Sequence, residues 1–412
     1  MTTPREFAIQ VTEQLQAAGY QALWAGGCVR DQLLNKQPKD YDVATIATPD
    51  QIRELFGHRK TLALGAAFGV ITLIGPKSAG NIEIATFRKD SDYSDGRRPD
   101  AVEFSTAEMD AMRRDFTING LFFDPLKQEI LDYVGGQADL ELKLIRAIGN
   151  PAERIAEDKL RMLRAVRFAA NLDFQIDPAT TDTIVRHANE INVVSVERIS
   201  AELTRMLTHE NRRRAVELLH ETGLLTNILP ELSPMVQDTE RFERTLQNLQ
   251  RLNSIESPPS FAVTMVTLLE SPAPEDFFNL CKRLKQPNEV TNTGHWILVN
   301  IDTIRQSHDL AWSAVQPLLV KPFAEQAIEF LQAVDPNCAA IPFCRERLAW
   351  PADKLDPAEL LNGDILRKHG FNPGPQYKKI LQETRRAQLD GQIATTEQAM
   401  QIAQSIVDQA SG

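Results

Sequence analysis

The hydrophobic pattern of the chain changes near residue 150, and this change constrains the fold more than any other feature of the sequence. After GNPAERIAED (149–158) the pattern is helical almost to the C-terminus, as in KLRMLRAVRFAANLDF (159–174). The pattern predicts an α+β fold, with an N-terminal mixed α/β domain that contains a sheet of about five strands, followed by an all-helical part. The runs that favour strands before residue 150 are ALWAGG, DYDVAT, FGVITLIG, IEIATFR, AVEFST and EILDYVGG.

Proline-rich stretches interrupt the helical part. They are ESPPS (256–260), ESPAPED (270–276) and FNPGPQ (371–376), and clusters of this kind end helices. A chain of 412 residues is long enough for several domains. We therefore predict four parts, with boundaries at residues 1–150, 151–235, 236–350 and 351–412.

Composition excludes several classes of protein. Apolar residues make up 42% and charged residues 25% of the chain, as in ordinary globular proteins. The four cysteines form no C-x-x-C pair, which argues against a zinc site or a disulfide scaffold. No apolar run is typical of a signal peptide or approaches the roughly 18 residues of a membrane span. We expect a cytoplasmic protein with no membrane partner. The net charge of -11 still allows a local basic surface for nucleic acid.

Two aspartates lie one residue apart in KDYDVAT. The alternation of residues 40 to 43 suits a strand, and residues i and i+2 of a strand share a face, so Asp40 and Asp42 are expected to project together. Paired carboxylates repel each other unless a cation lies between them, and their oxygens suit a hard divalent cation such as Mg²⁺. The pair therefore predicts a metal site.

A glycine pair precedes these aspartates in AGGCVRDQLL (25–34). We interpret this stretch as a strand end, a glycine turn and a helix start, where backbone amides can receive a phosphate. Arg30 adds a cation that can bind phosphate oxygens bidentately. Together with the aspartates, this arrangement favours metal-assisted phosphoryl transfer. The sequence contains no P-loop motif, which argues against a P-loop kinase.

Three segments resemble, in order, the signature blocks of the bacterial class II tRNA nucleotidyltransferases. They are GGCVRDQLLNKQPKDYDVAT (26–45), RRDFTINGLFFDP (113–125) and EDKLRMLRAVRFA (157–169). These CCA-adding and A-adding enzymes belong to the polymerase-β-like nucleotidyltransferase superfamily. The resemblance implies template-independent addition of CCA, or of the terminal A, to the 3′ end of tRNA from CTP and ATP with release of pyrophosphate. We expect no obligatory protein partner.

The resemblance also implies roles for residues of the predicted head. Two Mg²⁺ ions would bind Asp40 and Asp42, the catalytic pair, and Glu83 is a candidate third ligand. The alternative for Glu83 is a solvent-facing glutamate on a strand. Gly27 and Arg30 match the positions that contact the triphosphate.

The second block implies further nucleotide contacts. Arg114 matches a nucleotide-binding arginine, and Asp115 matches an aspartate near the sugar. A solvated ion pair is the alternative for the triplet RRD.

Asp95 and Arg98 resemble the flexible loop of enzymes that add the terminal adenosine, and a polar hairpin loop is the alternative.

The third block is expected to select the base. We predict that Asp158 and Arg161, at i and i+3 on one helix, face the same way, with Arg164 and Arg167 continuing the stripe. A carboxylate accepts from the amino group of cytosine or adenine, and a guanidinium donates to a ring acceptor, so the pair would select C and A. The resemblance implies that Glu157 orients the pair and that Arg164 and Arg167 assist nucleotide binding. The alternative is a surface salt bridge.

The resemblance divides the four parts by role: a catalytic head (1–150), a nucleotide-selecting neck (151–235), a body (236–350) and a tRNA-binding tail (351–412). Three other functions stay open: an A-adding-only enzyme, a poly(A) polymerase, and an RNA-binding module without activity. The dipeptide His308-Asp309 is also found in metal-dependent phosphohydrolases, but the further histidine and aspartate ligands that these enzymes need are missing at suitable spacing.

Overall fold

A computed structural model describes residues 2–90, 102–254, 258–371 and 374–411. The chain divides into two compact units, which are described separately. The first comprises residues 1–206 and 214–233, and the second comprises residues 207–213 and 234–412. Apart from residues 207–213 and 234–235, the predicted head and neck fall within the first unit, and the four-part division itself stays a prediction.

The first unit is built on a mixed seven-stranded sheet with the order β3-β4-β5-β2-β1-β8-β9. Neighbouring strands are antiparallel except β2 and β5, which run parallel with Val43 opposite Ile84. The α+β fold class is confirmed. The strands of this sheet are β1 (Ala22–Ala25), β2 (Val43–Thr45), β3 (Thr61–Gly65), β4 (Val70–Leu73), β5 (Ile82–Thr86), β8 (Leu121–Asp124) and β9 (Glu129–Asp132).

The sheet has two more strands than the sequence predicted. β3 has an almost entirely exposed burial pattern, and all four residues of β8 are buried, so neither strand shows the alternation by which a half-buried strand is recognised. The segment AVEFST instead contributes β7 (Val102–Phe104), which pairs with β6 (Arg88–Asp90) in a separate ribbon.

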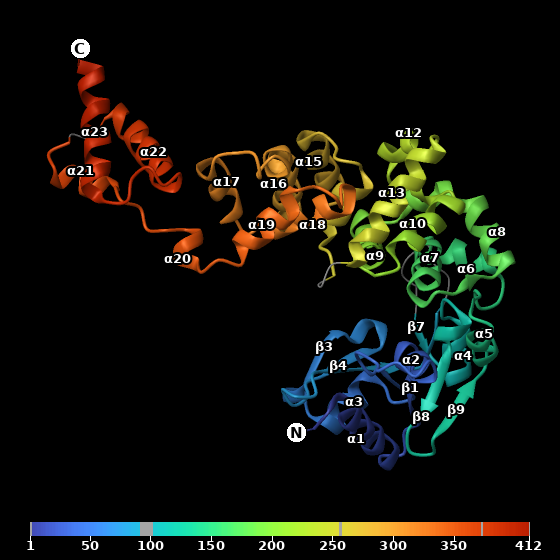
Figure 1. Cartoon of the computed structure of the whole chain (residues 1–412). Helices are drawn as coiled ribbons and strands as arrows, with labels where there is room; N and C mark the ends of the chain where they lie inside the picture. Colours follow the sequence, from blue (N-terminus) through green and yellow to red (C-terminus); the bar gives the residue numbers. More distant parts are fainter. Residues whose placement is uncertain (1, 91–101, 255–257, 372–373, 412) are drawn as a thin grey trace. The chain divides into compact units, whose positions relative to one another are not determined.

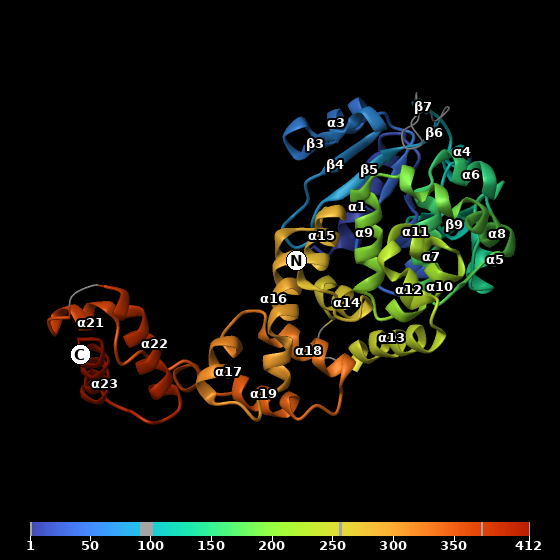
Figure 2. The same ribbon diagram turned by 90° about the horizontal axis from the view of Figure 1, so that it is seen from above.

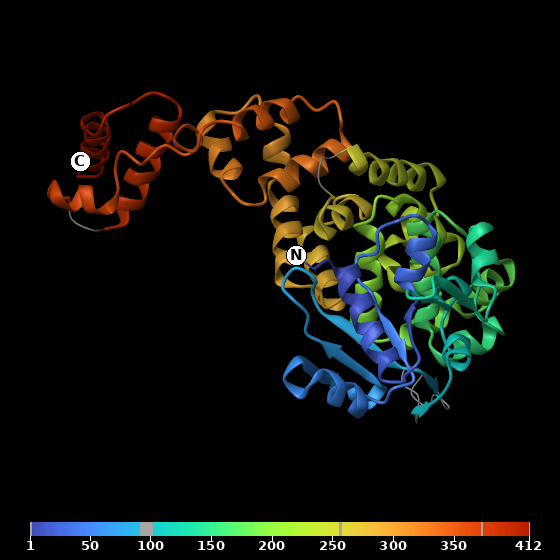
Figure 3. The same ribbon diagram turned by 90° about the horizontal axis from the view of Figure 1, so that it is seen from below.

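Helices cover the sheet and position its loops. Helix α1 (Pro4–Ala17) contacts β1 and β2, and α3 (Pro49–Phe56) contacts β3, β4 and β5; Figure 3 shows α1 in dark blue beside the strands. A cluster that includes Leu23, Phe87 and Phe122 forms the buried core on which α4 packs. The other head helices are α2 (Gly27–Leu33), α4 (Ala107–Met112), the short η3 (Thr117–Asn119) and α5 (Gly136–Glu141).

The helical neck follows in the same unit (Figure 2). Helix α7 is anchored by the predicted apolar line of Leu160, Leu163 and Val166, all of which are buried. Its opposite face carries Arg164 and Arg167, which are only partly buried. The neck helices are α6 (Pro151–Glu157), α7 (Leu160–Leu172), α8 (Pro178–His187), α9 (Val196–Leu207), α10 (Arg212–Glu221) and α11 (Leu224–Ile228).

The second unit is helical throughout the part that the structure describes. Its C-terminal end has its own core, which includes Leu366, Ile380 and Ala403. None of the described helices is both long and apolar enough to span a bilayer. The principal helices are α13 (Thr239–Arg251), α14 (Phe261–Leu268), α15 (Pro274–Arg283), α16 (Asn288–Arg305), α17 (Trp312–Leu319), α18 (Ala324–Val334), α19 (Ala340–Leu348), α21 (Gly363–Lys368), α22 (Pro375–Leu389) and α23 (Thr396–Ser411).

Candidate active site

The glycine turn lies where β1 ends and α2 begins, as predicted. Gly26 has a left-handed φ of 69°, and a Cβ added there would lie 2.9 Å from Nη1 of Arg114. Glycine is therefore required both for the turn and for the close approach of the arginine. One turn into α2, Arg30 donates to Asp31 and, over 2.8 Å, to Oδ1 of Asn119.

Asp40 and Asp42 do not lie on a strand, contrary to the prediction, because β2 begins only at Val43. They belong to the extended segment that leads into β2. The alternation nevertheless holds: Asp40 and Asp42 are exposed, and Tyr41 between them is buried. Tyr41 packs edge-to-face on Trp24, with ring centroids 4.7 Å apart. The buried ring fixes the segment so that both carboxylates project to the same side.

Glu83 extends this acidic group from the neighbouring strand β5, which pairs with β2. Desolvation, together with the charges of Asp40 and Glu83, raises the pKa of Asp42 to about 6. A carboxylate whose ionised form is destabilised by other carboxylates is a suitable place for a divalent cation. Among the described residues, however, no three acidic, histidine or cysteine side chains are close enough to form a metal site on their own. The donor set fits a metal ion whose other ligands come from substrate or water.

The two arginines of the second block, Arg113 and Arg114, are held by a buried carboxylate, that of Asp110. Asp110 on α4 accepts from Nε of Arg113 over 2.9 Å and from Nη2 of Arg114 over 3.0 Å. Although burial alone would raise the pKa of Asp110, the two arginines lower it. Arg114 also donates to the carbonyl of Asn119. Both guanidinium groups are therefore fixed before any ligand binds.

Asp115 uses all of its acceptor capacity within the protein. Oδ1 accepts from the amide of Phe116 and from Nδ2 of Asn119, and Oδ2 accepts twice from Arg164, over 2.8 and 2.5 Å. A carboxylate offers about four lone-pair sites. Burial alone would raise the pKa of Asp115, but Arg164 and these hydrogen bonds lower it, and Asp115 raises the pKa of Arg164 in return.

The third block is arranged differently from the predicted single helix. Asp158 is the C-cap of α6, with an extended φ of -150°, and α7 starts only at Leu160. Asp158 and Arg161 therefore do not lie one turn apart on one helix, and their side chains have different partners. Asp158 instead accepts from both terminal nitrogens of Arg198 on α9, over 3.1 and 2.6 Å, and from the amide of Leu160.

Arg161 is held from the neck and from the head. It donates to Glu157 over 2.5 Å and to the carbonyl of Arg154 over 2.7 Å, and Nη2 donates to the carbonyl of Arg113 over 3.3 Å. The carboxylate of Glu157 thus orients Arg161 directly, and its hydrogen bonds go to Arg161 and Arg154. The two candidates for base selection, Asp158 and Arg161, are thus held by different partners. The alternative of a surface salt bridge between them is not what the structure shows.

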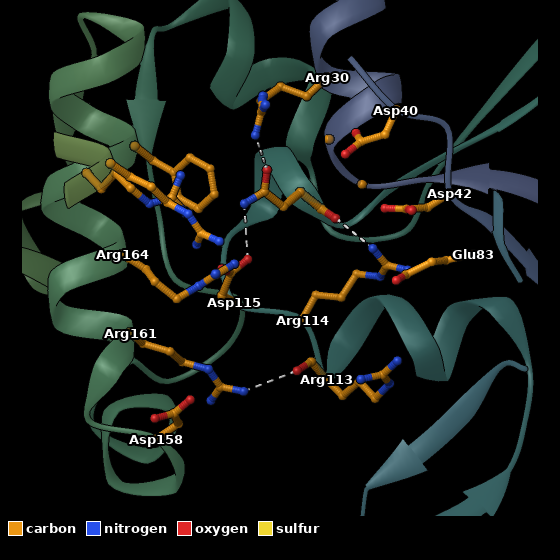
Figure 4. A pocket seen from close by; sticks show the side chains of 16 residues that line it. Arg30, Asp40, Asp42, Glu83, Arg113, Arg114, Asp115, Asp158, Arg161 and Arg164 are labelled. Carbon is orange, nitrogen blue, oxygen red and sulfur yellow. Dashed lines mark hydrogen bonds and ion pairs between the residues drawn. The ribbon is translucent and has the colours of Figure 1, made fainter. Parts of the chain in front are cut away.

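All these groups line one cavity of about 750 Å³ in the first unit. In Figure 4 the three carboxylates Asp40, Asp42 and Glu83 lie on one side, and Asp158, Arg161 and Arg164 come from the neck on the other. Every predicted site residue that the structure describes, except Glu157, lines this cavity. The lining comprises Gly26, Gly27, Arg30, Asp40, Asp42, Glu83, Arg113, Arg114, Asp115, Asn119, Asp158, Arg161, Arg164, Arg167, Phe168 and Arg205.

The charges of the cavity are unevenly distributed. Seven of these lining residues are arginines and five are acids, with the metal-binding candidates on one side. A polyanion with bound divalent cations matches this distribution, because the arginines can bind its oxygens while the acids bind the cations. The site can therefore hold a nucleoside triphosphate and bring its phosphates to the aspartates.

Sequence reasoning missed three of the residues that fix the arginines. Asn119 bridges Arg30 and Asp115, Asp110 holds Arg113 and Arg114, and buried Glu202 accepts from Arg167 over 2.5 Å. Asn119 lies within the second signature block and could have been found there, whereas Glu202, on α9, has no local signal in the sequence.

Asp95 and Arg98 lie outside the described residues. Asp309 is 3.1 Å from the neighbouring His308, and neither is in a metal group of the described residues.

Comparison with known proteins assigns parts of the chain to described domain families. The chain matches two domain families, described as "Poly A polymerase head domain" over residues 22–146 and "Probable RNA and SrmB- binding site of polymerase A" over residues 173–236. Fold and site together define the chain as a nucleotidyltransferase of the polymerase-β-like class. The family matches alone do not distinguish poly(A) polymerases from the tRNA enzymes.

Relatives that match over nearly the whole chain make this distinction. The chain is 31% identical to the CCA-adding enzyme of Streptococcus suis (strain 05ZYH33), over 96% of both chains. It is 34% identical to that of Limosilactobacillus reuteri (strain DSM 20016), over 94% of this chain and 93% of the relative. This chain belongs to the CCA-adding enzyme family of tRNA nucleotidyltransferases, which confirms the resemblance found in the sequence.

Solved structures support the same assignment. The CCA-adding enzyme of Bacillus stearothermophilus in complex with CTP superposes with a TM-score of 0.82 at 26% identity, over 100% of both chains. The Thermotoga maritima CCA-adding enzyme complexed with tRNA shares the fold, with a TM-score of 0.68 at 21% identity, over 97% of this chain and 95% of that one. Enzymes of this family normally use a divalent metal ion.

The raised pKa of Asp42 predicts how the metal-free protein responds to pH. The ordinary pKa of 3.8 rises to about 6 on folding, so the folded state binds the proton more tightly and loses stability as pH rises between these values. Asp42→Asn removes the charge and should stabilise the metal-free protein at pH 8, by about 1 kcal/mol because solvent screens this exposed group. The gain should shrink as pH falls from 6 toward 4.

Thermal unfolding in EDTA across pH 5 to 8 measures this effect. Added Mg²⁺ serves as the internal control, because it should stabilise the wild type more than Asp42→Asn. A stability difference that does not vary with pH would show that the carboxylate is not destabilised by its neighbours.

Proposed function

We propose that this protein adds the complete CCA sequence to tRNA 3′ ends, using CTP and ATP and two Mg²⁺ ions. The observation that supports this proposal is that one cavity contains the paired carboxylates, a set of fixed arginines and two separately supported groups of opposite charge for the base. The full-length relatives named above are CCA-adding enzymes. The bacterial cytoplasm, where tRNA and both nucleotides occur together, is the proposed location.

The protein's own residues contribute mainly by positioning. Asp40 and Asp42 would hold the Mg²⁺ ions, which when bound lower the pKa of the primer 3′-hydroxyl and neutralise charge on the phosphates. Glu83 would add a further carboxylate from β5. Gly27, at the start of α2, and Arg30 would receive the triphosphate, together with Arg114, Arg164 and Arg167. Phosphoryl transfer needs little else from a protein than such alignment and charge stabilisation.

The sugar would be recognised by groups that Asp115 holds rather than by Asp115 itself. Its acceptor sites are filled by Phe116, Asn119 and Arg164. The amide of Asn119 and the guanidinium of Arg164 both line the cavity. Asp115 would thus act as a positioning residue for these two side chains.

Base selection would depend on Asp158 and Arg161. Within the described residues, Asp158 accepts three hydrogen bonds, which leaves about one of four lone-pair sites for a base amino group. Arg161 uses Nη1 and Nη2 for protein contacts and retains donors for a ring nitrogen or carbonyl. Uracil and guanine would place a carbonyl against Asp158, where it stays unpaired.

The tail would contribute to tRNA binding. Lys368, Lys378, Lys379 and Arg386 are exposed on α21 and α22. None of these side chains has an ion pair with any residue that the structure describes. Cations that are not already paired with carboxylates can displace counterions from a phosphate backbone, which supplies sequence-independent affinity.

Primer extension tests the proposal. Transcripts of tRNA that end at nucleotide 73, at the first C or at CC are incubated with CTP, ATP or both, with Asp40→Ala as the inactive control. We expect two C additions and then one A, limited to one CCA. Addition only of A to the CC transcript would identify an A-adding specialist, and continued A addition a poly(A) polymerase. No incorporation by the wild type would refute the proposal.

A substitution at Asp158 tests base selection. Asp158→Ala removes the acceptor for the amino group and should reduce discrimination against UTP and GTP by about 1–3 kcal/mol, measured as the ratio of kcat/KM values in single-nucleotide addition. Asp182→Ala, at an exposed aspartate of α8, is the matched control and should keep wild-type discrimination. Unchanged selectivity in Asp158→Ala would reassign this residue to a purely structural pairing with Arg198.

A further inference from the structure

Phe168 is the sole apolar side chain, glycines aside, among the described residues that line the cavity. It lies on α7 and is 8% exposed. Its ring packs edge-to-face on Phe116 of the head, with centroids 5.8 Å apart. The ring therefore has a fixed orientation at the place where neck and head meet inside the first unit.

Three arginines surround this ring. The guanidinium carbon of Arg167 lies 4.0 Å from the ring centroid, that of Arg30 5.3 Å and that of Arg164 5.4 Å. All three distances are within the roughly 6 Å over which a cation is attracted to an aromatic face. Arg164 and Arg167 come from α7 itself, whereas Arg30 reaches the ring from α2. We name Arg30, Arg164 and Arg167 the arginine hub.

The three positive charges of the arginine hub lie close together, and an aromatic ring can stabilise this arrangement. Three like charges around one point repel each other, and the ring attracts each of them through its quadrupole. A carboxylate at the same place would also hold them, but it would cancel charge that a polyanion needs. It would also use N–H donors, whereas a stacked guanidinium keeps its in-plane donors free.

The free donors can be counted from the contacts. Among the described residues, Arg30 uses three of its nitrogens for Asp31 and Asn119, Arg164 uses two for Asp115, and Arg167 uses one for Glu202. A guanidinium has five N–H groups, so every member of the hub retains donors. These donors remain available to bind the oxygens of a phosphate chain.

We propose that Phe168 is the positioning residue of the triphosphate site, holding the arginine hub so that its donors converge on the nucleotide's phosphates. The proposal rests on the function proposed above, because it requires that the cavity bind a nucleoside triphosphate. It assigns Phe168 no contact with the base and no part in base selection, since the ring contacts neither Asp158 nor Arg161 by any ring interaction of the described residues.

Two substitutions distinguish the effect of the aromatic face of Phe168 from the effect of its apolar volume. Phe168→Leu keeps an apolar side chain but removes the aromatic face, and Phe168→Tyr keeps the face. A cation–π interaction of partly buried groups is worth about 0.5–2 kcal/mol, so Phe168→Leu should raise the KM for CTP and for ATP about two- to thirty-fold. The kcat should change little, and the discrimination against UTP and GTP should stay at the wild-type value. Phe168→Tyr should restore KM to within about twofold of the wild type.

The matched control is Phe174→Leu. Phe174 is also buried, at 6% exposure, and no arginine stacks on its ring in the described part of the chain. This variant should lose comparable apolar contacts while leaving KM unaltered. Thermal unfolding of all three variants records any general loss of stability.

Equilibrium binding of inorganic tripolyphosphate, without tRNA, tests the hub directly. Phe168→Leu should weaken the binding of tripolyphosphate and of CTP by the same factor, because the arginine contacts that are lost are contacts to phosphates. Wild-type affinity in Phe168→Leu, an equal effect of Phe174→Leu, or no rescue by tyrosine would overturn the proposal. If the wild-type protein bound neither probe, the proposed function would fail first, so the two failures are distinguishable.

Discussion

The ion pair between Asp115 and Arg164 connects the two halves of the candidate active site. Asp115 follows the arginine pair of the head, Arg164 lies on α7 of the neck, and they meet over 2.5 Å although 49 residues separate them in sequence. Asp115 is only 9% exposed. Breaking such a buried pair by removing one partner typically costs about 3–5 kcal/mol, because the other charge stays buried and unpaired. The pair therefore fixes the arginines that line the cavity from both halves relative to one another.

The remaining contacts solve a related problem, which is to hold many cations in one cavity without neutralising them. Asp110 binds two arginines at once, Glu202 binds Arg167 and Arg205 at once, and Phe168 contacts three. Shared acceptors of this kind fix the guanidinium groups with few negative charges. The resulting positive surface faces the carboxylates Asp40 and Asp42, whose mutual repulsion favours a bound cation. The uneven distribution of charge, rather than any single residue, makes the cavity suitable for a triphosphate with its metal ions.

Much of this arrangement could be predicted from short-range sequence patterns. The α+β fold, the glycine turn at Gly26 and the one-sided projection of Asp40 and Asp42 all follow from residues a few positions apart. The residues proposed to select the base were placed less well. Helix periodicity put Asp158 and Arg161 on one helix, but α6 ends at Glu157. The side chain of Asp158 then accepts from the amide of Leu160 and pairs with Arg198. Periodicity does not reveal a helix break that contains neither proline nor glycine.

What the sequence could not supply are partners that lie far apart along the chain. Arg198 is 40 residues from Asp158, and Glu202 is 35 residues from Arg167. The strand β8 was missed because a fully buried strand shows no alternation, and β3 because it is exposed on nearly every residue. Phe168 lies within the third signature block, yet its proposed positioning role depends on Arg30, which only the fold brings to the ring.

A double-mutant cycle across Asp115 and Arg164 tests the central claim most directly. The dissociation constant for CTP is measured in the wild type, in Asp115→Asn, in Arg164→Gln and in the double variant, with the exposed pair Asp302 and Arg305 as the control cycle. If the pair positions the site, the single losses should not add, and the coupling energy should reach about 1–3 kcal/mol. The control cycle should show no coupling in CTP binding. Additive losses at Asp115 and Arg164 would mean that each binds nucleotide independently, and would contradict the account.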